Sequence, residues 1–304
     1  MTAAVEILLS TYNGGAYLEE LLISLARQDY PNLKVTIRDD GSTDNTLEII
    51  SAFNDRLTLR VIQGANLGPC GSFFELIRNA DPDADFYAFC DQDDVWLPGK
   101  ISRAVAFLAN ETAGQPLMYC GRQLITDKAL NVRCRSDMPT RPAQLGNALV
   151  ENIATGCTVV INRHARNLLL DRLPAPENIV MHDWWLYLVV SALGKVVFDS
   201  EALILYRQHG SNSIGFHNGL ARWRARLQRL LFENSRRKLK KQALCFLTAY
   251  DDLLNDATKK LITHVFDNGS SLMSKIKILF LDGSIYRQCS RDSFYIRLLL
   301  MTGK

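Results

Sequence analysis

Strand-like and helix-like segments alternate over the first ninety residues, and this alternation constrains the fold more than any other feature of the chain. Residues 5–9 form a short apolar run, a polar turn follows, and leucines at helical spacing then indicate a helix over 17–28. Repeated strand–helix units with short connections predict a parallel sheet covered by helices. The pattern recurs along the chain, with further strands expected at 35–38, 57–62 and 86–89 and further helices at 44–53 and 72–79.

Acidic residues follow two of the expected strands. Asp39 and Asp40 come after the second strand, and the run Cys90-Asp91-Gln92-Asp93-Asp94-Val95-Trp96 comes after the fourth. The carboxyl ends of parallel strands share one edge of a sheet, where ligands bind in open α/β folds. Carboxylates this close together repel one another and resist burial, so a divalent metal is expected among them. A solvated acidic turn is the alternative interpretation.

Two common phosphate-binding motifs are absent from the sequence. After the first strand the chain reads Ser10-Thr11-Tyr12-Asn13-Gly14-Gly15, which lacks the Gly-x-Gly-x-x-Gly pattern of dinucleotide sites, and no Gly-Lys-Thr phosphate loop occurs. A nucleotidyltransferase would need a glycine-rich basic loop here, so that class is disfavoured. A nucleotide at this edge would instead meet acceptors for its base and ribose, and a metal for its diphosphate.

Composition and targeting signals indicate a cytoplasmic protein. The chain has 304 residues, 47% hydrophobic and 22% charged, which suits one large domain with an addition, or two domains. The apolar stretch 184–198 is interrupted by Lys195 and predicts a buried helix followed by a strand rather than a membrane span. No basic leader precedes the first strand, and the seven cysteines are scattered without metal-site spacing.

Basic charge is concentrated in the last third of the chain. Residues 1–216 hold 18 Lys and Arg against 25 Asp and Glu, a net charge of −7, whereas residues 217–304 hold 17 against 7, a net charge of +10. Basic and apolar residues alternate between Arg222 and Leu244, which predicts a basic amphipathic helix. This helix either packs its apolar stripe on the rest of the protein or docks on an anionic membrane surface. A nucleic-acid partner is disfavoured, because no aromatic stacking platform accompanies the charge.

Seven polar or glycine-containing motifs follow one another between residues 5 and about 215. They are Ser10-Thr11-Tyr12-Asn13-Gly14, Arg38-Asp39-Asp40-Gly41-Ser42-Thr43-Asp44-Asn45-Thr46, Asn66-Leu67-Gly68, Cys90-Asp91-Gln92-Asp93-Asp94-Val95-Trp96-Leu97-Pro98, Thr155-Gly156-Cys157, His182-Asp183-Trp184-Trp185 and Tyr206-Arg207-Gln208-His209-Gly210-Ser211-Asn212. In this order they resemble the family 2 glycosyltransferases with a GT-A fold. The last two motifs together with Asp-Gln-Asp-Asp are similar to the bacterial rhamnosyltransferase-like branch of that family.

The resemblance implies both a fold and a reaction. The fold is a Rossmann-like, mostly parallel α/β sheet flanked by helices over residues 1–215, with a basic helical region over 216–304. The reaction is an inverting, metal-dependent transfer of a sugar from a nucleotide-sugar, with dTDP-L-rhamnose as the first choice, to a surface polysaccharide or lipid-linked oligosaccharide. UDP-glucose, UDP-galactose and UDP-N-acetylhexosamine stay open as donors, and a non-catalytic membrane-associated scaffold is a further alternative. The enzyme would work in the cytoplasm, peripherally on the inner face of the cell membrane; its oligomeric state is open.

The resemblance also implies roles for individual residues. Asp91-Gln92-Asp93 matches the family's Asp-x-Asp motif, which implies Asp93 as a ligand of Mg²⁺ or Mn²⁺, with His209 at the position of a late metal-binding histidine. Asp183 matches the family's general base, although an N-cap role at the start of a helix is an alternative. Acceptor contacts are expected from Gly156, His182 and Trp184, and donor contacts from Thr11, Asn13, Asp39, Asp40, Asn66, Gly68, Asp91, Asp94 and Arg207.

Overall fold

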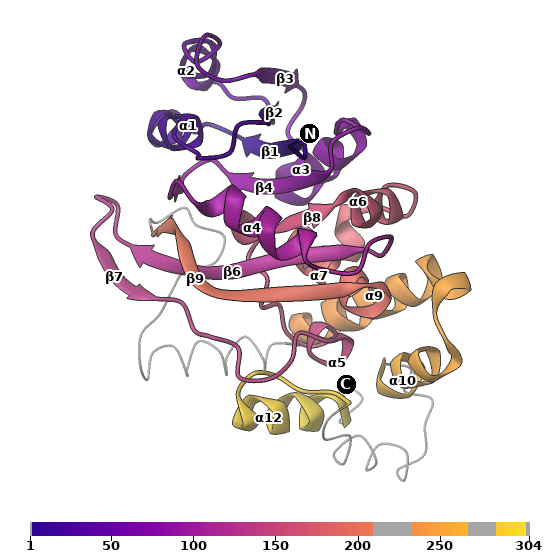
Figure 1. The fold of residues 1–304 in the computed structure, drawn as a ribbon. Helices are drawn as coiled ribbons and strands as arrows, with labels where there is room; N and C mark the ends of the chain where they lie inside the picture. Colours follow the sequence, from indigo (N-terminus) through magenta and orange to yellow (C-terminus); the bar gives the residue numbers. More distant parts are fainter. Residues whose placement is uncertain (1, 209–232, 267–283, 302–304) are drawn as a thin grey trace. The chain divides into compact units, whose positions relative to one another are not determined.

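A computed structural model gives the fold and describes residues 2–208, 233–266 and 284–301 (Figure 1). Contacts divide the chain into two compact units that interleave in sequence. The first unit contains residues 1–138, 154–171 and 194–215, and the second contains 139–153, 172–193 and 216–304. The second unit therefore includes two segments that precede the boundary expected at residue 215, and that boundary as a division of function stays a prediction.

The described residues of the first unit form one nine-stranded sheet, as the strand–helix alternation predicts. The strand order is β3-β2-β1-β4-β8-β6-β9-β5, and β7 pairs with β6. Strands β1 to β4 run parallel, as do β6 and β9, whereas β5, β7 and β8 are antiparallel to their neighbours. The strands are β1 (Val5–Thr11), β2 (Leu33–Asp39), β3 (Leu59–Gln63), β4 (Phe86–Asp91), β5 (Val95–Trp96), β6 (Leu117–Thr126), β7 (Val132–Arg135), β8 (Val160–Asn162) and β9 (Lys195–Arg207).

Helices cover both faces of this sheet, because alternate residues of a strand point to opposite sides. On one face, Ile7 and Leu9 of β1 join a core formed with helices α1, α2 and α4. On the other, α3 packs on β1 and β2, and its Phe73 ring lies 5.7 Å from the ring of Phe89. The predicted mostly parallel α/β sheet flanked by helices is thus confirmed. The helices of this unit are α1 (Leu18–Ala26), α2 (Thr46–Ser51), α3 (Gly68–Asn79), α4 (Lys100–Ala109), α6 (Arg163–Leu170) and the 3-10 turn η1 (Gly156–Thr158).

The observed elements differ from the predicted ones at the ends of three strands and at the start of one helix. β1, β2 and β4 extend to Thr11, Asp39 and Asp91, so the first polar residue of each motif belongs to the sheet itself. Helix α3 begins at Gly68, four residues earlier than expected, with a proline in its first turn. Proline there has a suitable fixed φ and lacks only an N–H that would stay unpaired in a helix start.

The second unit is helical. Helix α7 (His182–Leu193) ends directly before β9 of the first unit begins, so the predicted helix followed by a strand over 184–198 is confirmed. The remaining elements are α5 (Leu145–Ala148), η2 (Pro176–Asn178), α9 (Glu233–Ala249), η3 (Asp251–Leu253), α10 (Asp256–Phe266) and α12 (Ser290–Met301).

Helix α9 is the described part of the predicted basic helix, whose residues 222–232 lie outside the described ones. On its apolar side Phe246 is fully buried, and its ring lies 6.1 Å from that of Trp185 of α7. Across the described parts of the chain, each helix is too short or too polar to cross a bilayer.

Candidate active site

Three parallel strands of the first unit end side by side. Thr11 at the end of β1 is the register partner of Asp39 on β2, and Ser10 is the partner of Asp91 on β4. The sequence motifs that follow these strands therefore start from one edge of the sheet, as the alternation of strands and helices predicted.

Asp39 organises the turn that follows β2. Its carboxylate is buried and accepts hydrogen bonds from the hydroxyl of Thr11 (3.1 Å) and from the backbone N–H groups of Gly41 (3.2 Å) and Ser42 (2.9 Å). Gly41 has a φ of +84°, a conformation that favours glycine. Asp39 thus fixes the conformation of the turn after β2, at the edge of the sheet where a ligand would bind.

Asp40 links this turn to the next one. Its buried carboxylate pairs with Arg38 and accepts from the backbone N–H groups of Leu67 and Gly68, both at 2.9 Å. The exposed Asn66 accepts from the same N–H of Gly68 at 3.0 Å. The predicted donor residues Asp40, Asn66 and Gly68 are therefore brought together in one hydrogen-bonded group.

Gln92 joins the acidic segment to the turn after β1. Its side chain accepts from the backbone N–H of Tyr12 (2.8 Å) and donates to the backbone carbonyl of the same residue (3.0 Å). A side chain at Gly14 would begin 2.4 Å from the Gln92 carbonyl oxygen, so any larger residue there would displace the Gln92 amide from Tyr12. Nearby, Asn13 has a φ of +47° and accepts from the N–H of Thr43 at 2.8 Å. Sequence reasoning missed Gln92, although its place between two acids of the motif was the available signal.

The acidic segment combines two half-buried carboxylates with one fully buried. Asp91 and Asp93 are half-buried, and Asp94 is 0% exposed. One oxygen of Asp94 accepts from the backbone N–H of Arg207 (3.2 Å), whereas Oδ2 accepts no hydrogen bond from the described residues. Burial, and then the charges of Asp93 and Asp91, raise the pKa of Asp94 well above its usual range.

These residues suit a divalent cation. Asp91, Asp94 and Cys157 bring one potential ligand atom each to within 4.8 Å of one another. An orphaned buried carboxylate oxygen is an acceptor that a cation can satisfy, and carboxylates are the ligands that Mg²⁺ and Mn²⁺ prefer. The predicted ligand Asp93 lies in the same segment, and the predicted ligand His209 lies outside the described residues.

A buried lysine lies in the same part of the core. The Lys100 side chain is 2% exposed, and its ammonium lies 3.5 Å from the centre of the Trp96 ring, a cation–π contact. Its Nζ has no hydrogen-bond partner among the described residues. Burial lowers the pKa of Lys100 to about 8, although the nearby thiols of Cys90 and Cys157 and the Asp94 carboxyl act in the opposite direction. Lys100 is thus a buried amine that lies beside the acidic segment and loses its proton more easily than an exposed lysine.

Arg207 ties the end of β9 to the acidic segment. Its guanidinium donates to the backbone carbonyl of Asp93 (3.0 Å) and to that of Lys128, and it pairs with Glu20. It also lies 4.6 Å from the centre of the Tyr17 ring. These contacts hold the segment in place, and the donor role expected for Arg207 stays a prediction.

The predicted base and two predicted acceptor residues lie in the first turn of α7, in the second unit. Asp183 is the second residue of the helix rather than the one before it, is 7% exposed, and accepts from the N–H of Trp184 at 2.6 Å. The Trp184 indole donates to the backbone carbonyl of Ala148 (2.6 Å). His182 is buried, which lowers its pKa to about 3, so its imidazole is neutral at physiological pH. The third predicted acceptor residue, Gly156, is buried in η1 of the first unit.

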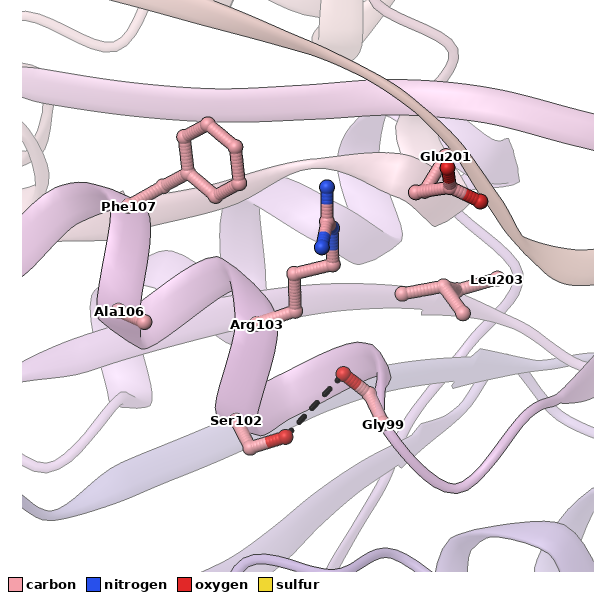
Figure 2. Close-up of a pocket in the computed structure, with 7 residues that line it drawn as sticks. All are labelled: Gly99, Ser102, Arg103, Ala106, Phe107, Glu201 and Leu203. Atoms are coloured by element: carbon pink, nitrogen blue, oxygen red, sulfur yellow. Dashed lines mark hydrogen bonds between the residues drawn. The ribbon is translucent and has the colours of Figure 1, made fainter.

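The first unit also has a hollow of about 570 Å³, beside α4 and β9. Figure 2 shows Arg103 of α4 reaching toward Glu201 and Leu203 of β9. The Arg103 guanidinium is already paired with Asp199, and none of the predicted site residues lines the hollow. We therefore assign the site to the sheet edge, where the polar motifs converge.

Known proteins resemble the chain in both sequence and fold. A family model described as glycosyl transferase family 2 matches residues 6–166. The dTDP-rhamnosyl transferase RfbG of Shigella flexneri is 30% identical over 223 residues, which cover 68% of this chain and 73% of that protein. Against several other glycosyltransferases the match spans 36% to 66% of the relative's length.

Two solved structures share the fold. S. aureus TarS in complex with UDP-GlcNAc superposes with a TM-score of 0.63 at 19% identity, covering 98% of this chain and 91% of the TarS chain. The mannosyltransferase PcManGT from Pyrobaculum calidifontis, in complex with GDP-Man and Mn²⁺, gives a TM-score of 0.52 at 17% identity, covering 100% and 86%. At such identities the likeness concerns the fold alone, and it confirms the GT-A architecture that the motifs predicted.

Proposed function

This chain belongs to glycosyl transferase family 2 and uses a nucleotide-sugar donor, and we propose that it is an inverting, metal-dependent enzyme with dTDP-L-rhamnose as its donor. The observation that carries the proposal is the convergence of Thr11, Asp39 and the Asp91–Asp94 segment at the carboxyl edge of parallel strands. Ligands bind at this edge in open α/β sheets.

The donor site is proposed to lie on the turns that Asp39 and Asp40 organise. Both carboxylates are occupied by hydrogen bonds within the protein. They therefore act by fixing the turns. The exposed Asn13 and Asn66 also accept backbone hydrogen bonds through their side-chain oxygens, so their amide NH₂ groups are proposed to meet the base and ribose. Turns that are held in this way would change little when a donor binds, which limits the entropy lost on binding.

Mg²⁺ or Mn²⁺ is proposed to bind at the acidic segment. Asp91 and Asp93 are half-buried and reach solvent. Asp94 of the same segment is fully buried, and its Oδ2 has no hydrogen-bond partner among the described residues. A bound divalent cation would neutralise charge on the departing diphosphate as a Lewis acid. The Mn²⁺ in the PcManGT complex is consistent with this assignment.

Asp183 is proposed as the general base. Inversion requires a carboxylate that takes the proton from the acceptor hydroxyl while its oxygen attacks the anomeric carbon. The bond from that carbon to the diphosphate oxygen then breaks, and the nucleoside diphosphate leaves with the electron pair. The first turn of α7 fixes Asp183 through the N–H of Trp184, which supports a single orientation for the carboxylate.

The identities of the donor sugar and of the acceptor are also proposed. RfbG is named a dTDP-rhamnosyl transferase, and this supports rhamnose over the UDP-sugars. We further propose a surface-polysaccharide or lipid-linked oligosaccharide acceptor at the inner face of the cell membrane, where the +10 charge of residues 217–304 would attract anionic lipids.

The donor proposal is tested with a nucleotide-sugar panel. Release of nucleoside diphosphate is measured from dTDP-rhamnose, UDP-glucose, UDP-galactose and UDP-N-acetylglucosamine, with Mn²⁺ or with EDTA. We expect turnover of dTDP-rhamnose only with metal, and none in Asp93→Ala. Asp83→Asn, an exposed acid near the opposite end of β4, is the matched control and should keep full activity. Full activity of Asp93→Ala in EDTA contradicts the metal role.

The base is tested by Asp183→Asn, which keeps the size of the side chain and removes its basicity. Turnover should fall by about two orders of magnitude or more, the usual contribution of general-base catalysis, with little change in donor affinity. Asp256→Asn alters an exposed first-turn aspartate of α10 and should change neither. Equal losses of turnover and donor affinity in Asp183→Asn would point to a structural role instead.

A further inference from the structure

Helix α12 carries apolar side chains on opposite faces. Ile296 and Leu300 are buried, whereas Phe294, Tyr295 and Leu298 are 53%, 39% and 37% exposed. A helix that is apolar on both sides is normally covered on both sides. Single exposed apolar side chains are common, whereas these three neighbours at helical spacing form one contiguous apolar patch. We call the positions i, i+3, i+4 and i+7 of this exposed face the outer stripe of α12: Arg291, Phe294, Tyr295 and Leu298.

The segment before α12 fixes which face points outward. Arg287 pairs with the buried Glu151 (3.2 Å), and the N–H of Gln288 donates to the same carboxylate (2.6 Å). The Tyr286 hydroxyl donates to the backbone carbonyl of Pro142 (2.8 Å). Since these contacts hold the start of the helix and its inner face is packed, the outer stripe cannot turn inward without breaking them.

None of the described side chains of helix α9 is a large exposed apolar one. Its apolar residues Leu239, Ala243 and Phe246 are 6%, 2% and 0% exposed, and Leu244 and Leu247 are half-buried, so this side of the helix packs within the second unit. This favours the packing interpretation for the described part of the basic helix. Its exposed positions include the cations Arg237, Lys238 and Lys241.

The chemistry of the outer stripe fits the interface of an anionic membrane. Phenylalanine, tyrosine and leucine bury apolar area at the level of lipid headgroups, and a neighbouring arginine reaches their phosphates. The net charge of +10 on residues 217–304 complements anionic lipid. From typical side-chain areas the three apolar residues expose roughly 250 Å², well below the ~800 Å² per partner of a standard protein interface. A lipid surface therefore suits the stripe better than a second protein.

We propose that the outer stripe of α12 inserts into the headgroup region of an anionic membrane and that the cations of α9 add electrostatic attraction without insertion. The inference deepens, and rests on, the proposed location of the enzyme at the membrane face. It assigns the contact to α12 rather than to α9, the described part of the basic helix.

The test is co-sedimentation of the full chain with vesicles of phosphatidylglycerol and phosphatidylcholine, compared with phosphatidylcholine alone. The wild type should bind the anionic vesicles. The double variant Phe294→Gln and Leu298→Gln should lower the bound-to-free ratio by about tenfold or more, because two apolar side chains lose their transfer free energy. Leu253→Gln, which alters a 46% exposed leucine of η3 in the same unit, should bind like the wild type.

Two further readouts keep the outcomes distinct. Metal-dependent donor turnover in solution should be equal in the wild type and the double variant, so loss of vesicle binding is separable from failure of the proposed reaction. The proposal is overturned if the double variant binds as well as the wild type, or if the wild type does not bind anionic vesicles. It is also overturned if light scattering shows a wild-type oligomer that the double variant dissociates, because a second copy then covers the stripe.

Discussion

The Gln92 side chain links two loops at the edge of the sheet that are eighty residues apart in sequence. Both of its polar atoms bond to the backbone of Tyr12, and Gly14 leaves room for them. Because the acidic segment and the turn after β1 are coupled in this way, a change at one transmits to the other. Gln92 is therefore a positioning residue of the proposed donor site.

Replacing Gln92 tests this coupling. Gln92→Ala removes two hydrogen bonds worth about 1 kcal/mol each, so the donor KM should rise by up to about thirtyfold with a smaller change in kcat. Steady-state kinetics with dTDP-rhamnose and Mn²⁺ measure both. Tyr119→Phe, which removes a buried hydrogen bond from β6 to Asp199, is a control for general loosening of the sheet and should keep the wild-type KM. Similar kinetics in Gln92→Ala and the wild type would contradict the positioning role.

His182 makes the stability of the protein depend on pH. Burial lowers its folded-state pKa from 6.5 to about 3, so between these values the unfolded chain binds a proton that the folded chain does not. Stability is therefore lost as the pH falls below about 6.5. At pH 5 the loss from this residue is about 2 kcal/mol. Denaturant unfolding at pH 7.5 and pH 5 should show that His182→Gln loses about that much less than the wild type; identical losses would refute the assignment.

Residue types at strand ends were predictable from sequence, but their partners were not. Asp39, Asp40 and the Asp91–Asp94 segment follow from apolar runs that end in acids. The bonds from Asp40 to Leu67 and Gly68 join turns 27 and 28 residues apart, and only the three-dimensional path of the chain brings them together. The burial of Lys100 against Trp96 is equally invisible in the sequence, because lysine is ordinarily a surface residue.

At the scale of elements, helical periodicity identified α9 but not what its apolar side contacts. Phe246 packs against both Trp185 and Tyr250, with ring centres 6.1 and 5.3 Å away, and the Trp185 and Tyr250 rings lie 6.1 Å from each other. This aromatic cluster joins α9 to α7, the helix that carries Asp183. The stability of the cluster therefore bears on how firmly the proposed base is held.

Truncation of this aromatic cluster should be costly. Phe246→Ala removes a fully buried ring and should lower the free energy of unfolding by about 3–5 kcal/mol. Phe294→Ala removes a ring that is 53% exposed on α12 and should cost less than about 1 kcal/mol. Urea unfolding followed by circular dichroism measures both. Equal losses in the two variants would mean that α9 is not packed as described.

At the scale of the whole molecule, the α/β architecture was predictable and the interleaving of the two units was not. Alternating strands and helices predict the sheet because each element shows its own periodicity. The chain, however, enters the second unit at residues 139–153 and 172–193 before it reaches 216–304. Nothing in local periodicity marks such returns, since they depend on contacts between distant segments. The donor-side residues consequently belong to the first unit, and Asp183 belongs to the second.

Calorimetric titration of dTDP with and without Mn²⁺ tests whether the acidic segment of the first unit holds the metal of a donor site. We expect Mn²⁺ to tighten dTDP binding by about tenfold or more in the wild type and in Asp183→Asn, because a divalent cation held by the acidic segment would neutralise the charge of the diphosphate. In Asp93→Ala, dTDP binding should be the same with and without Mn²⁺. If dTDP binds the wild type equally in both conditions, or if Asp93→Ala keeps the full enhancement by Mn²⁺, the acidic segment is not the diphosphate end of a metal-dependent donor site.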